Sequence, residues 1–510
     1  MPSQTELPRA AQQSYQQLPK NTRFWQSLYS GDSANELERV TMNIPNRSKR
    51  VSLLSLIAAL QATASFAAVP PAMIEGPIAA EAPGHPSRNG IYSASALDLD
   101  VYDYIEEEFF ISGSGNTYSQ PDMATGAIES GGHPYKTRLV VRRPSEDDFN
   151  GIVIVEWINV TGGPDKDIDW WQSGEHFMRN GYAYVVVSAQ QMGIDTMIDW
   201  SPERYGQLDM TASGRVENDA LSYDVFSAVG RAINRLGEES PAGATDFLDG
   251  LRAEQIIATG HSQSASRLAT YANHIHLLEP VYDGFMVHGG GGLIRDDQPV
   301  KIFKLMAETD MRRRVASPQP DSYNFRQWEV AGSSHVDVPF EIEYAKARNL
   351  MAGLPVDDVA PRDTECALPP YSTVPFRDVL SAAYDHLVNW IRDDTPPPIA
   401  ARLQVARALP EVEFARDTYG NVLGGIQLAE HAVATAKNTG MNSGTTNRFC
   451  FLYGSHEPFT AEQLRSLYPS RESYLEAVRR VVEQNLAAGY ILPYAAERTL
   501  EKAKSREIGL

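Results

Sequence analysis

Short, almost wholly apolar runs alternate with helical patterns through the middle of the chain, and this alternation limits the fold more than any other feature. Residues 152–158 are nearly all apolar, as a strand covered on both faces must be. Further strands are predicted at 104–112, 137–143, 182–189, 255–259, 282–288, 302–307 and 325–330, and helices at 170–180, 218–236, 262–274, 376–392, 470–488 and 495–504. The alternation predicts an α/β fold, with a mostly parallel sheet and helices on both faces.

The segment 256–268 carries the clearest chemical signal. An apolar strand, Ile-Ile-Ala-Thr, runs into Gly-His-Ser-Gln-Ser, and a helix with small residues on its first turn follows. This is the context of a nucleophile elbow, where a sharp strand-to-helix turn lifts one serine hydroxyl, here that of Ser262, clear of the sheet. Ser264 replaces the final glycine of the G-x-S-x-G pattern but is still small. The alternative interpretation of Ser262 is an ordinary helix N-cap.

A serine hydroxyl becomes a good nucleophile when a base removes its proton, so a histidine and an acid are expected downstream, in the order serine, acid, histidine. His335 follows a predicted strand and the small turn Ala-Gly-Ser-Ser, and is the candidate base. The preceding strand ends in Ala-Glu-Thr-Asp. We favour Asp310 as the acid because it lies a few residues past the strand end, and Glu308 is the alternative.

The tetrahedral oxyanion of such a reaction needs fixed hydrogen-bond donors. In this arrangement one donor is the backbone N–H of the residue after the nucleophile, which is Gln263. The other comes from the loop after the third strand, residues 159–163, where we favour Val160.

Two other motifs are set aside. His-Gly-Gly-Gly-Gly at 288–292 resembles a lipase oxyanion motif but follows the serine, whereas that motif precedes it, so a flexible turn is expected there. Asp-Lys-Asp-Ile-Asp at 165–169 resembles a calcium loop, yet Trp170 stands in place of the glycine and His176 in place of the bidentate glutamate. We therefore expect no metal and no cofactor.

The N-terminal region has the pattern of a displaced export signal. The basic residues Arg47, Lys49 and Arg50 precede an apolar run at 51–62, and small residues follow at Ala64, Ser65 and Ala67. This order predicts a signal peptide over 42–67 that begins at Met42 and is cleaved after Ala67, or second best after Ala64. Residues 1–41 are then an extension without a folded role. An uncleaved anchor is the alternative, although the apolar run is shorter than the ~20 residues that a bilayer needs.

Export predicts a periplasmic or secreted protein with no membrane span after signal removal. It also places the two cysteines, Cys366 and Cys450, where disulfides persist, so a bridge between them is expected. Two buried, inert thiols are the alternative, because a sequence does not supply the geometry that a bridge requires.

Domain organisation is indicated by the triple proline at 396–398, which stops the preceding helix. Residues 68–398 are predicted to form the sheet domain and residues 399–510 an appended segment packed on it. The formal net charge of −20 is spread along the chain without a basic stripe, which excludes a nucleic-acid-binding surface of the usual kind.

Four motifs together carry a resemblance. They are Gly-His-Ser-Gln-Ser at 260–264, Ala-Glu-Thr-Asp at 307–310, Trp-Glu-Val-Ala-Gly-Ser-Ser-His at 328–335, and Asp-x-x-Gly-Asn-x-x-Gly-Gly at 417–425. With these motifs the chain resembles the bacterial alpha/beta hydrolase domain family, from about residue 90 to the C-terminus. The resemblance implies the α/β-hydrolase fold and a triad of Ser262, His335 and either Asp310 or Glu308, but no particular substrate.

The expected activity is hydrolysis of a small-molecule carboxylic ester through an acyl-enzyme on Ser262, without a cofactor. A peptidase or an acyltransferase with the same triad is an alternative. The alternative from a different class is a non-catalytic exported binding protein with the same fold.

Overall fold

The computed structural model of the protein describes residues 71–234, 241–408, 410–506 and 508. The predicted extension and signal peptide, residues 1–67, lie outside this part of the chain. None of the helices in the described ranges has the length and apolar character that crossing a membrane requires.

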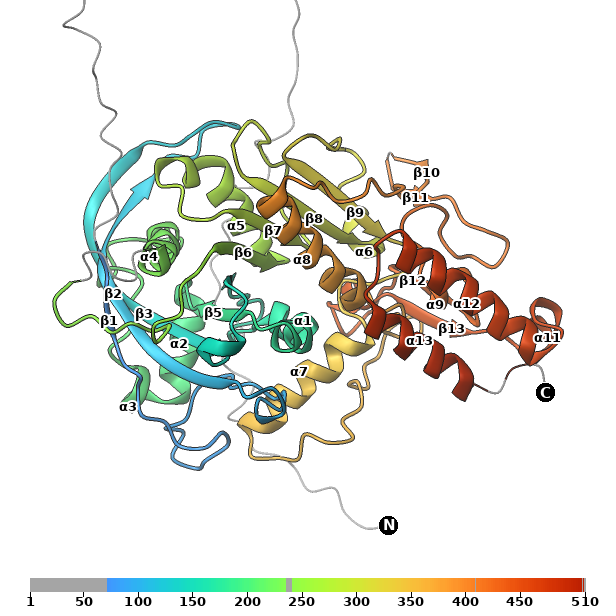
Figure 1. Ribbon diagram of the computed structural model, residues 1–510, viewed down its shortest axis with the longest axis horizontal. Coiled ribbons are helices and arrows are strands. Elements are labelled where there is room, and N and C mark those ends of the chain that lie inside the picture. The colour runs from blue at the N-terminus through green and yellow to red at the C-terminus, as the bar shows by residue number, and fades with distance from the viewer. Residues whose placement is uncertain (1–70, 235–240, 409, 507, 509–510) are drawn as a thin grey trace, which may run out of the picture. The chain divides into compact units, whose positions relative to one another are not determined.

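A nine-stranded sheet forms the centre of the described chain, in the order β1-β2-β3-β5-β4-β6-β7-β8-β9 (Figure 1). Its strands are β1 (Met73–Glu75), β2 (Ile105–Tyr118), β3 (Ile128–Arg143), β4 (Ile152–Trp157), β5 (Ala183–Val187), β6 (Gln255–His261), β7 (Gly284–His288), β8 (Lys301–Ala307) and β9 (Phe325–Val330). Neighbours from β5 to β9 pair in parallel, whereas β1, β2 and β3 form an antiparallel extension. Because β3 pairs antiparallel with β5, the parallel part begins at β5.

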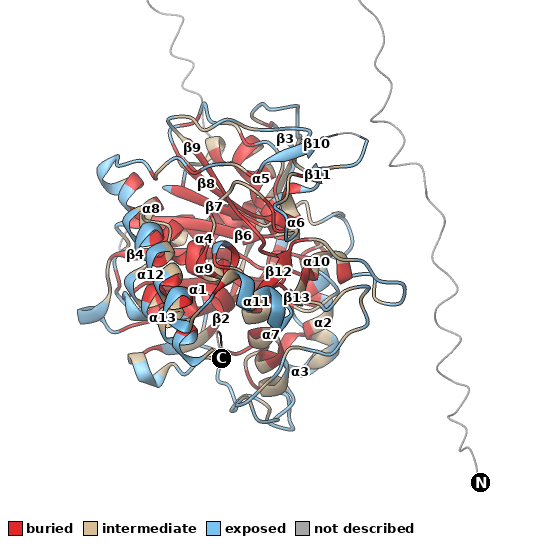
Figure 2. Ribbon diagram, turned by 90° about the vertical axis from the view of Figure 1, so that its right-hand side faces the viewer, coloured by how far each residue is buried: buried red, intermediate tan, exposed pale blue. Residues whose placement is uncertain are grey.

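Helices cover both faces of this sheet. Before the triple proline at 396–398 they are α1 (Ile168–Arg179), α2 (Gln191–Trp200), α3 (Pro202–Tyr205), α4 (Ser222–Asn234), α5 (Gln263–His274), α6 (Glu308–Met311), α7 (Val338–Met351) and α8 (Phe376–Asp393), with short 3-10 helices at Asp100–Tyr102, Glu146–Asp148 and His276–Leu278. Alternate side chains of β4 enter two separate cores. Val153 and Val155 pack with α4 and α5, and Ile152 and Ile154 pack with α1 and α8. Figure 2 shows the strands as the buried centre, which confirms the predicted mostly parallel sheet with helices on both faces.

The antiparallel extension is longer than the sequence predicted. Strands β2 and β3 pair from Ile105 opposite Arg143 to Tyr118 opposite Ile128, through glycine-containing stretches that resemble turns. Gly113 lies opposite Tyr135, and a Cβ at Gly113 would lie 2.7 Å from the Tyr135 hydroxyl oxygen. The glycine therefore makes room for an aromatic ring within the strand pair, and does not end the strand.

The C-terminal residues pack against the edge of the sheet at β9. Their elements are β10 (Val405–Arg407), β11 (Glu413–Phe414), α9 (Ala429–Ala432), β12 (Ala436–Thr439), α10 (Cys450–Tyr453), β13 (Ser455–Pro458), α11 (Ala461–Leu467), α12 (Arg471–Ala487) and α13 (Pro493–Ser505). The backbone N–H of Ala331 donates to the Ile426 carbonyl oxygen at 2.9 Å, and the Trp328 and Tyr490 rings lie 5.2 Å apart. A disulfide joins Cys366 to the buried Cys450, with an S–S distance of 1.96 Å.

Candidate active site

Ser262 lies in the tight turn between β6 and α5, with φ 61° and ψ −113°. A non-glycine residue in this region of conformational space costs about 1–3 kcal/mol, a strain that functional sites often carry. Its N–H donates to the His288 carbonyl oxygen at 3.0 Å, which ties the turn to the neighbouring strand β7. The elbow predicted from the sequence is therefore present as a local structure.

Gly260 and Ser264 explain how this turn closes. A Cβ at Gly260 would lie 3.1 Å from the Ser264 carbonyl carbon, so the glycine allows strand and helix to approach closely. The Ser264 hydroxyl donates to the His261 carbonyl oxygen at 2.9 Å and accepts from the His261 N–H at 3.1 Å. The serine in place of the last glycine of the motif thus bonds across the turn with its own side chain.

His335 follows β9 and lies beside Asp310, which belongs to the short helix α6 after β8. The distance from His335 Nδ1 to Asp310 Oδ1 is 2.6 Å, and both side chains are buried. The other carboxylate oxygen of Asp310 accepts a hydrogen bond from the Ala307 N–H at 2.8 Å. Because both oxygens are engaged, the carboxylate holds one orientation towards the histidine.

Glu308, the alternative acid, has different partners. Its Oε1 lies 2.6 Å from a guanidinium nitrogen of Arg416, and its Oε2 accepts from the Gly332 N–H at 3.2 Å. The side chain is fully buried. Glu308 therefore forms an ion pair that links α6 to the C-terminal residues, while Asp310 contacts the histidine.

The loop after β4 is joined to the serine turn by Asn159. Its side-chain amide donates to the His261 carbonyl oxygen at 2.9 Å, and its side-chain oxygen accepts from the Thr161 N–H at 2.8 Å. Val160 lies between these two residues. Across the part of the chain that the structure describes, the backbone N–H groups of Val160 and Gln263 donate no hydrogen bond to another residue.

A cavity of about 290 Å³ opens beside the serine turn and is lined by both Ser262 and His335. Its walls combine aromatic and aliphatic side chains with three charged ones, and they come from the loop after β4, from α7 and from the C-terminal residues. The other lining residues are Asn159, Thr161, Gly162, Pro164, Lys166, Ile168, His261, Val336, Phe340, Glu341, Tyr344, Arg362, Phe449, Leu452 and Tyr453. Ser262 and His335 therefore border one space in which a small molecule fits.

Charge in this cavity comes from Lys166, Arg362 and Glu341. Arg362 forms an ion pair with the buried Glu341. Burial lowers the pKa of Lys166 to about 8, although Asp165 acts in the opposite direction. The Lys166 ammonium donates to backbone carbonyl oxygens of Thr161 and Pro164, so it also supports the loop after β4.

Three histidine rings, those of His261, His288 and His335, lie close together beside the serine turn, and the sequence did not predict this cluster. The ring of His261 lies 4.3 Å from that of His335 and 4.7 Å from that of His288. Nε2 of His288 lies 2.9 Å from Asp169 Oδ2, within the buried core. Burial, reinforced by the two neighbouring rings, lowers the pKa of His261 well below its usual value. The position of His261 directly before Ser262 was the available signal.

The glycine-rich segment after His288 packs against the serine turn in a specific way. A Cβ at Gly289 would lie 2.5 Å from His261 Nε2, and one at Gly290 would lie 2.5 Å from the Ser262 carbonyl oxygen. Only residues without a side chain allow this approach, so the segment forms part of the support of the turn.

The three carboxylates of the Asp-Lys-Asp-Ile-Asp segment all turn towards protein partners. Asp165 accepts from Ser188 at 2.5 Å, Asp167 pairs with Arg142 at 2.5 Å, and Asp169 contacts His288. Among the described residues, no group of three or more His, Cys, Asp or Glu side chains is arranged to hold a metal ion.

The parallel sheet covered by helices and the strand-turn-helix that carries Ser262 define an α/β hydrolase fold. The chain belongs to the alpha/beta hydrolase domain family, whose model matches residues 74–501. No curated protein matches the chain.

Several solved structures are similar to this chain at low identity. An α/β serine hydrolase from Xanthomonas campestris is 12% identical, with 49% of this chain and 97% of that chain covered and a TM-score of 0.26. A glucuronoyl esterase from Solibacter usitatus is 11% identical, with 44% and 66% covered and a TM-score of 0.22. The cell wall degrading esterase LipA from Xanthomonas oryzae is 13% identical, with 36% and 42% covered and a TM-score of 0.21. The family assignment rests on the family model alone.

Proposed function

We propose that the protein is a serine hydrolase that cleaves carboxylic esters through an acyl-enzyme on Ser262. The observation that carries this proposal is the contact between Asp310 and His335 beside a strained serine that borders the same cavity as His335. Asp310 orients the imidazole and stabilises its charged form. His335 takes the proton from the Ser262 hydroxyl during attack on the ester carbonyl and gives it to the departing alcohol. Water then releases the acid by the same steps.

The oxyanion is proposed to accept hydrogen bonds from the backbone N–H groups of Gln263 and Val160. Support comes from their lack of an acceptor among the described residues and from the Asn159 bond that fixes the loop of Val160 to the serine turn. Donors that are fixed before the reaction lower the barrier without a reorganisation cost.

The substrate is proposed to be a small ester with an apolar or aromatic body. Phe340, Tyr344, Phe449 and Leu452 supply the apolar wall of the cavity. The proposed location is the periplasm or the cell exterior, which the Cys366–Cys450 disulfide supports because such bonds persist in oxidising compartments.

Hydrolysis of p-nitrophenyl esters of graded chain length tests the proposal. Wild type is expected to hydrolyse at least one of them, and His335→Ala to lower kcat by about 10⁴- to 10⁶-fold, because triad members act as a unit. The matched control is His85→Ala, which removes an exposed histidine. Unchanged hydrolysis in His335→Ala contradicts the mechanism, and a wild type inactive on every ester favours a peptidase, an acyltransferase or a binding protein.

A further inference from the structure

A second cavity, of about 240 Å³, is bordered by Gly292 and Leu293 at the end of the glycine-rich segment. It shares no lining residue with the cavity that contains Ser262. Gly290 packs against the backbone of Ser262, whereas Gly292 borders the second cavity. The glycine-rich segment therefore runs from the serine turn to the second cavity.

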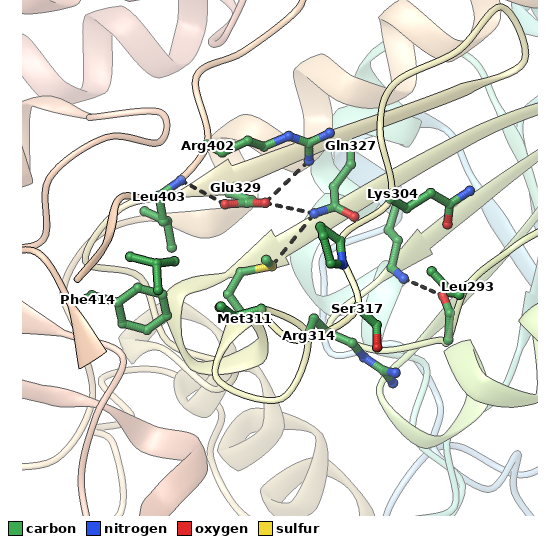
Figure 3. A pocket seen from close by; sticks show the side chains of 15 residues that line it. Leu293, Lys304, Met311, Arg314, Ser317, Gln327, Glu329, Arg402, Leu403 and Phe414 are labelled. Atoms are coloured by element: carbon green, nitrogen blue, oxygen red, sulfur yellow. Dashed lines mark hydrogen bonds and ion pairs between the residues drawn. The ribbon is translucent and has the colours of Figure 1, made fainter. Parts of the chain in front are cut away.

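One end of this cavity is cationic. Lys304, on β8 next to the edge strand β9, is 3% exposed, and its ammonium donates to the Gly292 carbonyl oxygen at 2.7 Å and to the Gly291 carbonyl oxygen at 3.3 Å. Figure 3 shows the Lys304 ammonium and the Arg314 guanidinium towards the same side of the cavity. Within the described ranges, no carboxylate forms an ion pair with either group.

Glu329, the one carboxylate among the described residues that line the cavity, is already fully engaged. It accepts from Arg402 at 3.3 Å, from the Gln327 side chain at 2.8 Å and from the Leu403 N–H at 2.8 Å, and Figure 3 shows these partners together. It therefore does not compensate the two cations. Burial, with the nearby charge of Arg314, lowers the pKa of Lys304 to about 7, although Asp310 acts in the opposite direction.

Part of the remaining wall is apolar and is formed by Met311, Val315, Leu403, Val405 and Phe414, and Figure 3 shows Leu403 and Phe414 on the side away from Lys304. The polar side chains of Ser317, Gln319 and Gln327 also border the cavity. A ligand that suits both parts has one negative head group and a short apolar body, because the buried Lys304 ammonium and the partly exposed Arg314 guanidinium favour an anion and the apolar wall favours hydrocarbon.

We propose that this cavity binds a small aliphatic carboxylate. Its head group lies between Lys304 and Arg314, where a planar guanidinium matches the two carboxylate oxygens and the ammonium adds a charged donor. Its hydrocarbon body lies against Leu403, Val405 and Phe414. The proposal goes beyond ester hydrolysis and is tested without turnover, so it stands or falls separately from the proposed activity.

Isothermal titration of the purified protein with sodium hexanoate at pH 6, below the pKa of Lys304, measures this binding. Wild type is expected to bind with a Kd of about 1 mM or tighter. Lys304→Met and Arg314→Gln are each expected to weaken binding by about 10- to 100-fold, the effect of losing a hydrogen bond to a charged group. The matched control is Arg312→Gln, which removes the same charge from an exposed neighbouring position and leaves Kd unchanged.

Hexylamine and inorganic phosphate complete the experiment. Hexylamine, which has the body without the negative head, is expected not to bind, and phosphate, which has the charge without the body, is expected to bind at least about tenfold more weakly. Absence of hexanoate binding, equal binding of hexylamine, or an unchanged Kd in both variants overturns the proposal. Melting curves verify folding, and the partly exposed Arg314 keeps the test decisive if Lys304→Met fails to fold.

Discussion

Replacing both Cys366 and Cys450 by alanine is predicted to destabilise the protein and to weaken substrate binding. The bridge joins residues 84 positions apart. In the chain-entropy model, closing a loop of this length contributes about 4 to 5 kcal/mol, and strain or residual structure in the unfolded chain brings the expected loss to about 2 to 4 kcal/mol. With about 2.1 cal/mol/K of unfolding entropy per residue over roughly 440 residues, the melting temperature falls by about 2 to 5 °C.

The same double substitution is also expected to loosen the wall of the cavity that contains Ser262. Phe449 directly precedes Cys450, and Arg362 lies four residues before Cys366. Both Phe449 and Arg362 line the cavity that contains Ser262. KM is therefore expected to rise about three- to tenfold, the effect of ~1 kcal/mol of lost contact, with little change in kcat, because the Asp310–His335 contact belongs to other elements.

Differential scanning calorimetry and ester kinetics, with and without reductant, measure both effects. Reduced wild type is the matched control and should behave as the double variant does, while reductant should leave the double variant unchanged. A melting temperature and KM equal to those of oxidised wild type would refute the reasoning, as would two titratable thiols in the denatured, unreduced, exported protein.

Three further predictions separate the roles of individual groups. Asp310→Asn should lower kcat by about 10³- to 10⁴-fold, because the imidazole loses its orienting acceptor. Glu308→Gln should mainly lower the melting temperature and should change kcat much less, because it breaks a buried ion pair. If kinetics and melting show the opposite pattern, the two residues have exchanged roles. Burial lowers the folded-state pKa of Lys304 to about 7, so above this pH the unfolded chain binds more protons than the folded chain. The free energy of unfolding should therefore rise with pH from about 7 to about 10. Urea titrations of Lys304→Met should lack this rise. Expression from Met42 should yield an exported protein that begins near Ala68, and an intact mass that retains the N-terminal segment would contradict the signal peptide.

The central part of the fold was predictable because short local sequence patterns indicate its strands and helices. Residues 256–258 within the predicted strand at 255–259 are all apolar, and the small residues around Ser262 indicate the turn that follows. The predicted helix at 376–392 likewise corresponds to α8, which carries an apolar face along its length. Where one or both faces of a strand or helix are buried, the spacing of its apolar residues indicates which side chains pack in the core.

Helix α7 was missed because its pattern is weak. It begins at Val338–Pro339, a pair that resembles a loop, and charged and apolar residues mix along it. Asp337 caps it, since its carboxylate accepts from the Phe340 N–H at 2.9 Å, but an Asp two residues before a proline also suits a turn. Two residues of the cavity wall, Phe340 and Tyr344, were therefore not predicted.

The remaining site contacts were not predictable because they join distant parts of the chain. Asp169 and His288 are 119 positions apart, and nothing near either residue in the sequence indicates the other. The preference for Asp310 over Glu308 rested on its distance from the strand end. The observed difference arises from Arg416, a residue of the C-terminal segment that pairs with Glu308.

Labelling with a fluorophosphonate probe, followed by mass spectrometry of the peptides, shows whether Ser262 is the nucleophile. We expect one labelled peptide, modified at Ser262, and no labelling of Ser262→Ala. The melting temperature of Ser262→Ala should be at least that of wild type, because the hydroxyl is assigned no structural role in the site. A wild type that is folded but unlabelled, or a Ser262→Ala variant that is still labelled and still hydrolyses esters, would contradict the role of Ser262 as the nucleophile.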